Sequence, residues 1–279
     1  MHCPGLHVSR ELQRLTLRSV LCWSLSFYPQ PLLNYKRRST LGLTVDFPML
    51  NVLGFLCYTI STASFLYSPT IRRQYAVRHP LEPVPTVRFN DFAFALHALI
   101  LCIIIYSQFW HRLWSFEELK GKRASRIVQG IYWGSVAGLV VIALIVLARG
   151  GDGSTPEQWA AIDVIYAFSY VKLIVTVVKY IPQAWHNYKV KSTIGWSIHG
   201  MLLDFTGSIL SIAQLLIDSA LESDWSGVTG NPVKFGLGNV SLMFDVIFIT
   251  QHYVLYRERA DKTEDESIDG ERRPLIDQA

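Results

Sequence analysis

The sequence predicts an all-α membrane protein with seven transmembrane helices in two similar halves. Half of the 279 residues are hydrophobic and only 17% are charged. The apolar residues fall in blocks of about 20, the length that crosses a hydrocarbon core of roughly 30 Å. One motif occurs twice, 153 residues apart, near the ends of two of these blocks. Because backbone groups in lipid must bond within their own segment, each block is expected to be a helix.

The blocks give seven expected spans. They lie at 19–35, 46–67, 90–110, 127–148, 159–182, 198–218 and 234–256. The loops after the first, third and fifth spans, and the segment after the seventh, carry more Lys and Arg residues than the loops on the other side. Cytosolic loops are enriched in these residues, so the C-terminus is expected in the cytosol and the N-terminus in a lumen or outside.

The duplicated motif defines two repeats. Its shared residues in the first copy are Pro29, Gln30, Asn34, Tyr35, Lys36, Ser39, Thr40 and Gly42, and in the second copy Pro182, Gln183, Asn187, Tyr188, Lys189, Ser192, Thr193 and Gly195. The register continues into the next span, where Asn51 corresponds to Asp204. Internal repeats in apolar segments are typical of transporters.

The repeats predict the domain organisation. Residues 19–110 form the first repeat with spans one to three, 111–158 are a linker with span four, and 159–256 form the second repeat with spans five to seven. A single linker helix gives both repeats the same orientation, as in SWEET-type sugar transporters. We also expect Asp91 and Asp245 to occupy matching places in the third helices.

The two ends differ from these repeats. Residues 1–18 are polar, and an N-terminally truncated or mis-started gene model is the preferred explanation for this segment. Residues 257–279 are charged and poor in apolar residues, as expected of a cytosolic tail.

The paired Pro-Gln dipeptides are interpreted as hinges. Proline inside a span removes a backbone hydrogen bond and bends the helix. Pro29, Gln30, Pro182 and Gln183 lie in equivalent register one turn from an expected cytosolic end. A proline that simply ends a span is the alternative, and the shared register favours the hinge.

Span five carries polar residues on one helical face. They are Lys172, Thr176, Lys179, Gln183 and Asn187. A lysine within a bilayer faces protein or water. Lys179 is expected to receive a substrate carboxylate, with Asn187 bonding the amine or carboxylate, although snorkelling of Lys179 to the membrane interface is an alternative.

Three acids in or near spans are candidate proton carriers. An unpaired carboxylate in an apolar helix must find a cation or take up a proton. Expected burial ranks Asp204 first, Asp245 second and Asp91 third, since Asp91 lies near a helix end.

These residues together resemble the PQ-loop superfamily and, within it, the cystinosins, a family of lysosomal cystine/proton symporters. The matching stretches are 23–30, 179–183, 191–197, 203–207 and 234–238. The resemblance implies export of L-cystine with protons from an acidic lumen. It implies a substrate site formed by Trp23, Phe27, Asn51, Lys179, Tyr180, Asn187 and Asp204. It gives Asp204, Asp91 and Asp245 roles in proton coupling, and marks Asp46 and Lys234 as further polar positions of functional weight.

The tail predicts a location. Glu271, Leu275 and Ile276 fit an acidic dileucine sorting signal, which is read by a clathrin adaptor in the cytosol and directs a protein to lysosomes or vacuoles. We therefore expect a multi-pass protein of that membrane, with the lipid bilayer, cystine and protons as partners.

Other classes are disfavoured. The basic residues sit in short loops, so nucleic acid is not an expected partner, and the four cysteines show no disulfide or zinc spacing. No nucleophile–base arrangement predicts an enzyme, and no cofactor is expected. Transport of cationic amino acids is the alternative, and a seven-helix receptor or sensor with Lys172 or Lys234 binding retinal is a remote one.

Overall fold

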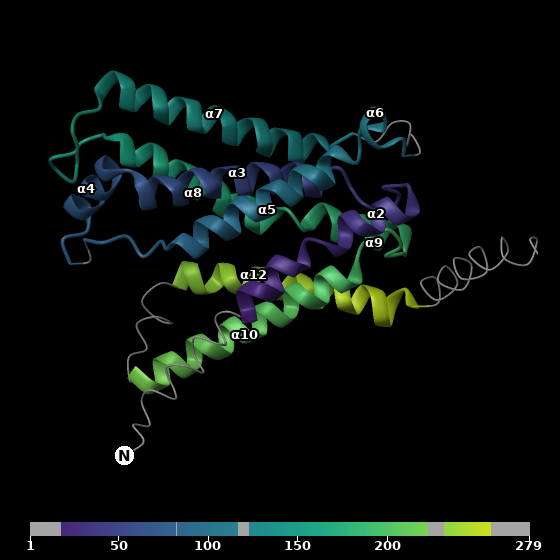
Figure 1. Ribbon diagram of the computed structural model, residues 1–279. Coiled ribbons are helices and arrows are strands. Elements are labelled where there is room, and N and C mark those ends of the chain that lie inside the picture. The colour runs from purple at the N-terminus through teal and green to yellow at the C-terminus, as the bar shows by residue number, and fades with distance from the viewer. Residues whose placement is uncertain (1–17, 82, 117–122, 223–231, 258–279) are drawn as a thin grey trace, which may run out of the picture. The chain divides into compact units, whose positions relative to one another are not determined.

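The computed structural model describes residues 18–81, 83–116, 123–222 and 232–257, and these are helical with no strand among them (Figure 1). By length and composition, four of the described helices could cross a membrane: Asp46–Tyr67, Phe89–Ser107, Arg126–Arg149 and Ala161–Val190. They correspond to expected spans two to five. Ile198–Ala213 is a shorter apolar helix at the position of span six.

The described chain forms two compact units. The first contains Met1–Thr44, Gln108–Leu119 and Tyr180–Ala279, as far as these are described, and the second contains Val45–Ser107 and Lys120–Lys179.

The second unit is built around α3. Its helices are α3 (Asp46–Tyr67), α4 (Pro69–Arg78), α5 (Phe89–Ser107), α7 (Arg126–Arg149) and α8 (Ala161–Val178). Helix α3 packs against both α5 and α8, and α7 runs along α8 (Figure 1). The α3–α8 contact is close because Gly54 has no side chain: a β-carbon there would press on Val175. Leu50, Leu53 and Val171 are buried in the same cluster.

The first unit contains both Pro-Gln motifs. Its helices are 18–26, α2 (Pro29–Arg37), α6 (His111–Trp114), α9 (Ile181–Val190), α10 (Ile198–Glu222) and α12 (Pro232–Thr250), which continues as the π-helix η1 (Gln251–Leu255). Helix α10 packs against α12 and contacts α2, and α9 contacts α12.

Each Pro-Gln motif begins a new helix. Pro29 and Pro182 lie in the first turns of α2 and α9, where a missing backbone N–H leaves no helical bond unmade. The preceding helices end at residue 26 and at Val178. The chain is therefore interrupted before each motif, and the hinge motion itself stays a prediction.

The compact units cut across the sequence repeats. Helix α8 opens the second repeat but packs with α3 of the first repeat, and α2 belongs to the first repeat but contacts α10 of the second. Each unit thus combines the first helix of one repeat with the second and third helices of the other. The repeat boundaries inferred from the sequence stay a prediction.

Candidate functional site

The two motif glutamines are buried and hydrogen-bonded in matching ways within the first unit. Gln30 Nε2 donates to the carbonyl oxygen of Gly195 at 2.9 Å, and Gln30 Oε1 accepts from the Ser197 N–H at 2.8 Å. Gln183 Nε2 donates to the carbonyl oxygen of Gly42 at 2.9 Å, and its Oε1 accepts from the Thr44 N–H at 2.8 Å. Each glutamine therefore holds the loop that follows the other motif.

A second layer of amides repeats the same symmetry. Asn34 accepts from Gln30 and donates to Gln108, whose Nε2 donates to the carbonyl oxygen of Pro31. The other copy has the same pattern. Asn187 accepts from Gln183 and donates to Gln251, whose Nε2 donates to the carbonyl oxygen of Ala184. Asn187 is 1% exposed, and its described bonds belong to this network.

The glutamines correct the expected alignment of the third helices. Gln108 and Gln251 play equivalent parts, so these helices correspond with an offset of 143 residues. With this offset, Asp245 of the second repeat corresponds to Cys102 of the first, and Asp91 of the first repeat corresponds to Lys234 of the second. The expected match of Asp91 with Asp245 is wrong, because the connection after the second helix is much longer in the first repeat, at 68–88, than in the second, at 223–231.

The loops after the two motifs cross at a pair of glycines. Gly42 and Gly195 have φ angles of +92° and +91°, a region that side chains rarely enter. A β-carbon on Gly42 would overlap the carbonyl oxygen of Ile194, and one on Gly195 would overlap that of Leu41. The two backbones can approach this closely only because both residues are glycine.

Asp204 lies in a second cluster of the first unit. Its Oδ2 accepts from Ser241 Oγ at 2.9 Å and from the Tyr180 hydroxyl at 3.3 Å, and the two hydroxyls are 3.2 Å apart. The Tyr180 ring packs against Phe244 and Phe248 with centroid separations of 5.4 and 6.0 Å. A half-buried carboxylate is thus held by two hydroxyl groups from two other segments.

Trp23 reaches the same helix one turn further on. A β-carbon at Gly207 would lie 2.7 Å from Trp23 Cδ1, so the indole sits directly on α10 three residues beyond Asp204. Trp23, Tyr180 and Asp204 therefore lie in one unit, and their role in substrate binding stays a prediction. Phe27 lies in the interruption before α2, and Asn187 belongs to the amide network rather than to this cluster.

In the second unit, two lysines share one aromatic ring. Lys172 Nζ is 3.9 Å from the centroid of the Phe55 ring and 5.6 Å from that of Tyr58. Lys179 Nζ is 5.9 Å from the same Phe55 centroid. Such contacts stabilise a cation away from water. Because Lys179 is 8% exposed, it is buried within protein, and snorkelling does not describe it.

Asn51 lies on the same face of α3, one turn before Phe55. Its side chain is 3% exposed, and its Oδ1 has no hydrogen-bond partner among the described residues. Leaving a buried acceptor unpaired costs about 1–3 kcal/mol. An unpaired acceptor one helical turn from the ring that both lysines approach suits a site for a polar ligand.

Burial puts Asp245, rather than Asp204, first among the three acids. Asp245 is 0% exposed, whereas Asp204 and Asp91 are only half-buried. The expectation that Asp204 is the most buried acid is wrong, because Asp204 faces two hydroxyls at a part-exposed place. Asp91 Oδ2 accepts from the Arg88 N–H at 2.7 Å, so Asp91 caps the start of α5.

Asp46 positions the linker helix. Its side chain is buried, and its Oδ1 accepts from the Ser125 N–H at 2.6 Å. Ser125 is the N-cap of α7, so one carboxylate ties the start of α3 to the start of α7. Lys234 lies in the first turn of α12, and its side chain lies outside the described residues, as do Glu271, Leu275 and Ile276.

Sequence reasoning did not find Gln108, Gln251 and Ser241. All three are polar residues in or beside an apolar segment, and that is the signal by which they could have been found. Their importance depends on which partner they reach, which spacing alone does not give.

Comparison with known proteins gives the family. A profile described as "PQ loop repeat" matches residues 15–71 and 164–224. The chain is 41% identical over 244 residues to "Cystinosin" of Drosophila melanogaster, covering 87% of this chain and 58% of that protein. It is 39% identical over 241 residues to "Cystinosin homolog" of Dictyostelium discoideum, covering 86% of this chain and 80% of that protein. It is 29% identical to "Cystine transporter" of Saccharomyces cerevisiae, covering 86% and 92%. The chain thus spans less than two thirds of the length of the Drosophila protein. It spans 80% of the length of the Dictyostelium protein.

Proposed function

The chain belongs to the cystinosin family of PQ-loop proteins, and on this basis we propose that it exports L-cystine with protons from the lumen of a lysosome or vacuole. The observation that carries the proposal is the Asp204 carboxylate, which Ser241 and Tyr180 hold within an apolar helix. An ionisable residue within an apolar helix marks a candidate site for a transported ion or substrate.

Cystine carries two carboxylates and two ammonium groups, and each unit taken by itself offers partners for such groups. In the second unit, Lys179 is a buried cation suited to a carboxylate, and the unpaired Oδ1 of Asn51 is an acceptor suited to an ammonium group. In the first unit, Trp23 and Tyr180 offer apolar rings, and the Asp204 carboxylate is suited to an ammonium group or a proton.

The finer architecture is part of the proposal. Seven spans form two parallel three-helix repeats joined by the linker helix α7, with the C-terminus in the cytosol. Alternating access then proceeds by bending at the interruptions before Pro29 and Pro182. The proposed mechanism is transport without a catalysed chemical reaction. It uses the proton as a co-transported ion and needs no cofactor.

Delivery to the membrane of the lysosome or vacuole is assigned to the tail. Glu271, Leu275 and Ile276 would be recognised by a clathrin adaptor in the cytosol. This assignment rests on the sequence pattern and on the location that the proposed activity requires.

Uptake of labelled cystine tests the function. Cells would express a variant lacking Glu271–Ala279, which is expected to reach the cell surface, and uptake would be measured at outside pH 5 to 6 and at pH 7 to 8, a window in which carboxylates and histidines of transporters titrate. Acid-stimulated cystine uptake above untransfected cells is expected. Uptake of lysine or arginine with no cystine uptake would replace the proposal by cationic amino-acid transport.

A further inference from the structure

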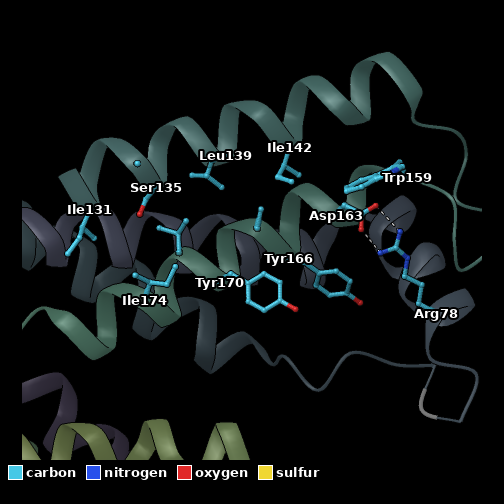
Figure 2. A pocket seen from close by; sticks show the side chains of 14 residues that line it. Arg78, Ile131, Ser135, Leu139, Ile142, Trp159, Asp163, Tyr166, Tyr170 and Ile174 are labelled. Atoms are coloured by element: carbon cyan, nitrogen blue, oxygen red, sulfur yellow. Dashed lines mark hydrogen bonds and ion pairs between the residues drawn. The ribbon is translucent and has the colours of Figure 1, made fainter. Parts of the chain in front are cut away.

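A groove runs along the surface of the second unit where α7 meets α8 (Figure 2). Its volume is about 760 Å³, within the range of pockets that enclose one small molecule. Ile131, Leu139 and Ile142 line it from α7, and Tyr166, Tyr170 and Ile174 line it from α8. None of these residues belongs to the sites described above.

Glycines hollow the groove on the α7 side. Gly134 and Gly138 line it, and a β-carbon on either residue would meet no other atom within 4 Å. Small residues in membrane helices normally allow a neighbouring helix to approach closely. Here they face open space. Helix α7 is the most apolar of the candidate spans, and none of its most apolar stretch is buried, as expected of a helix surface that meets lipid.

One end of the groove is polar and electrically neutral. Arg78 donates from both terminal nitrogens to the two carboxylate oxygens of Asp163 (Figure 2). It also donates to the carbonyl oxygen of Gln158. The Tyr166 hydroxyl and His79 Nε2 form a hydrogen bond of 3.0 Å nearby. Because Asp163 already neutralises Arg78, this end offers hydrogen bonds without a net charge.

The length of the groove limits what can fill it. From Asp163 to Ile174 an α-helix rises about 16 Å. That is about half of a hydrocarbon core of roughly 30 Å. A transmembrane helix from a second copy would extend along the whole core, whereas one lipid of a single leaflet has this depth.

We propose that this groove binds a membrane sterol, with its hydroxyl at the Arg78–Asp163 end and its rings against Tyr166, Tyr170 and Gly138. The neutral polar end suits a single hydroxyl better than a charged phosphate headgroup. A flat, rigid ring system suits a wall made of glycine on one side and aromatic faces on the other. The proposal is independent of the transported substrate.

A photoreactive sterol tests the site. The purified full chain would be reconstituted in phosphatidylcholine vesicles with a diazirine analogue of cholesterol, and cross-linked peptides would be mapped after illumination. Labelling of α7 and α8 within the groove, removed by excess cholesterol, is expected. Labelling only elsewhere, or labelling that cholesterol does not remove, would overturn the proposal.

Two glycine variants form a matched pair. Gly138→Leu places an apolar side chain in the groove, at a position where the added β-carbon meets no other atom within 4 Å, and is expected to reduce labelling at least about tenfold. Gly130→Leu also points into open space but lies outside the groove, so its labelling is expected to equal that of the unaltered chain. Equal labelling of both variants contradicts the proposal, as does conversion of a dimer to a monomer by Gly138→Leu, which would indicate a second copy. If Gly138→Leu does not fold, the peptide map of the unaltered chain decides alone.

Discussion

At the scale of single residues, Asp204 and its two hydroxyl donors define where the proposed proton coupling occurs. Ser241 and Tyr180 come from segments far apart in the chain, yet both donate to the same carboxylate oxygen. Their hydrogen bonds are worth more to a charged acceptor than to a neutral one. Protonation of Asp204 therefore changes the local bonding, which is the requirement for a proton to influence substrate binding.

Replacing Asp204 by asparagine tests this role. Asp204→Asn keeps the side-chain size but cannot take up a proton, so acid-stimulated cystine uptake is expected to fall at least about tenfold. Thr206→Val is the control, since Thr206 is exposed on the same helix and its hydroxyl bonds only to the carbonyl oxygen of Leu202 among the described contacts. Uptake would be normalised to surface protein. Acid-stimulated uptake that is unchanged in Asp204→Asn would count against the role.

At the scale of helices, the two Pro-Gln motifs form a reciprocal clasp. Gln30 holds the loop at Gly195 and Ser197, and Gln183 holds the loop at Gly42 and Thr44. Buried amides that satisfy one another in this way specify a single arrangement, whereas a half-satisfied network is costly. Each Pro-Gln motif thus has two effects. Its proline lies in the first turn of a new helix, and its glutamine positions the loop that follows the other motif.

A charge placed in the clasp should destabilise it. Gln183→Glu can still accept from the Thr44 N–H, but it loses its donors to Gly42 and Asn187 and brings carboxylate oxygens against their oxygens. The free energy of unfolding in detergent is expected to fall by at least about 2 kcal/mol. Gln129→Glu should change the free energy of unfolding far less, because the Gln129 side chain makes one described hydrogen bond, at the start of α7. Equal losses in the two variants would refute the clasp.

The linker helix depends on a single carboxylate at its start. Asp46→Ala removes the acceptor for the Ser125 N–H, so the first turn of α7 is expected to open more often. Hydrogen exchange of residues 125–128 should speed up about fivefold or more, as loss of about 1 kcal/mol implies. Asp46→Asn keeps an acceptor oxygen and should exchange nearly as slowly as the unaltered chain. Fast exchange in both variants would point to charge rather than to this bond.

At the scale of the whole molecule, pattern and composition predicted the helices but not their partners. Apolar blocks located spans two to five, because length and hydropathy are local properties. The duplicated motif led to the family, which the relatives confirm. The match of Asp91 with Asp245 was wrong, because an apolar helix carries little information on register, and only the bonds of Gln108 and Gln251 reveal it.

Grouping of the helices was equally beyond the sequence. Residues of α8 resemble the first helix of a repeat, and nothing in their spacing shows that they pack with α3 of the other repeat. Close packing at Gly54 and Val175 decides this, and it depends on complementary shapes of segments about 120 residues apart. Burial of Asp245 depends in the same way on packing around α12, so the order of the acids could not be inferred from their positions in the spans.

The location of the whole protein provides the last prediction. If Glu271, Leu275 and Ile276 form the sorting signal, Leu275→Ala combined with Ile276→Ala removes both apolar side chains that an adaptor binds, while the helices stay unchanged. The full-length double variant is expected to accumulate at the cell surface, measured by surface biotinylation, with at least about a fivefold rise in the labelled fraction. Gln278→Ala in the same tail is the control and should stay inside the cell. A double variant that stays inside would assign sorting to another part of the chain, and surface accumulation would allow the uptake assay to be repeated on a chain of full length.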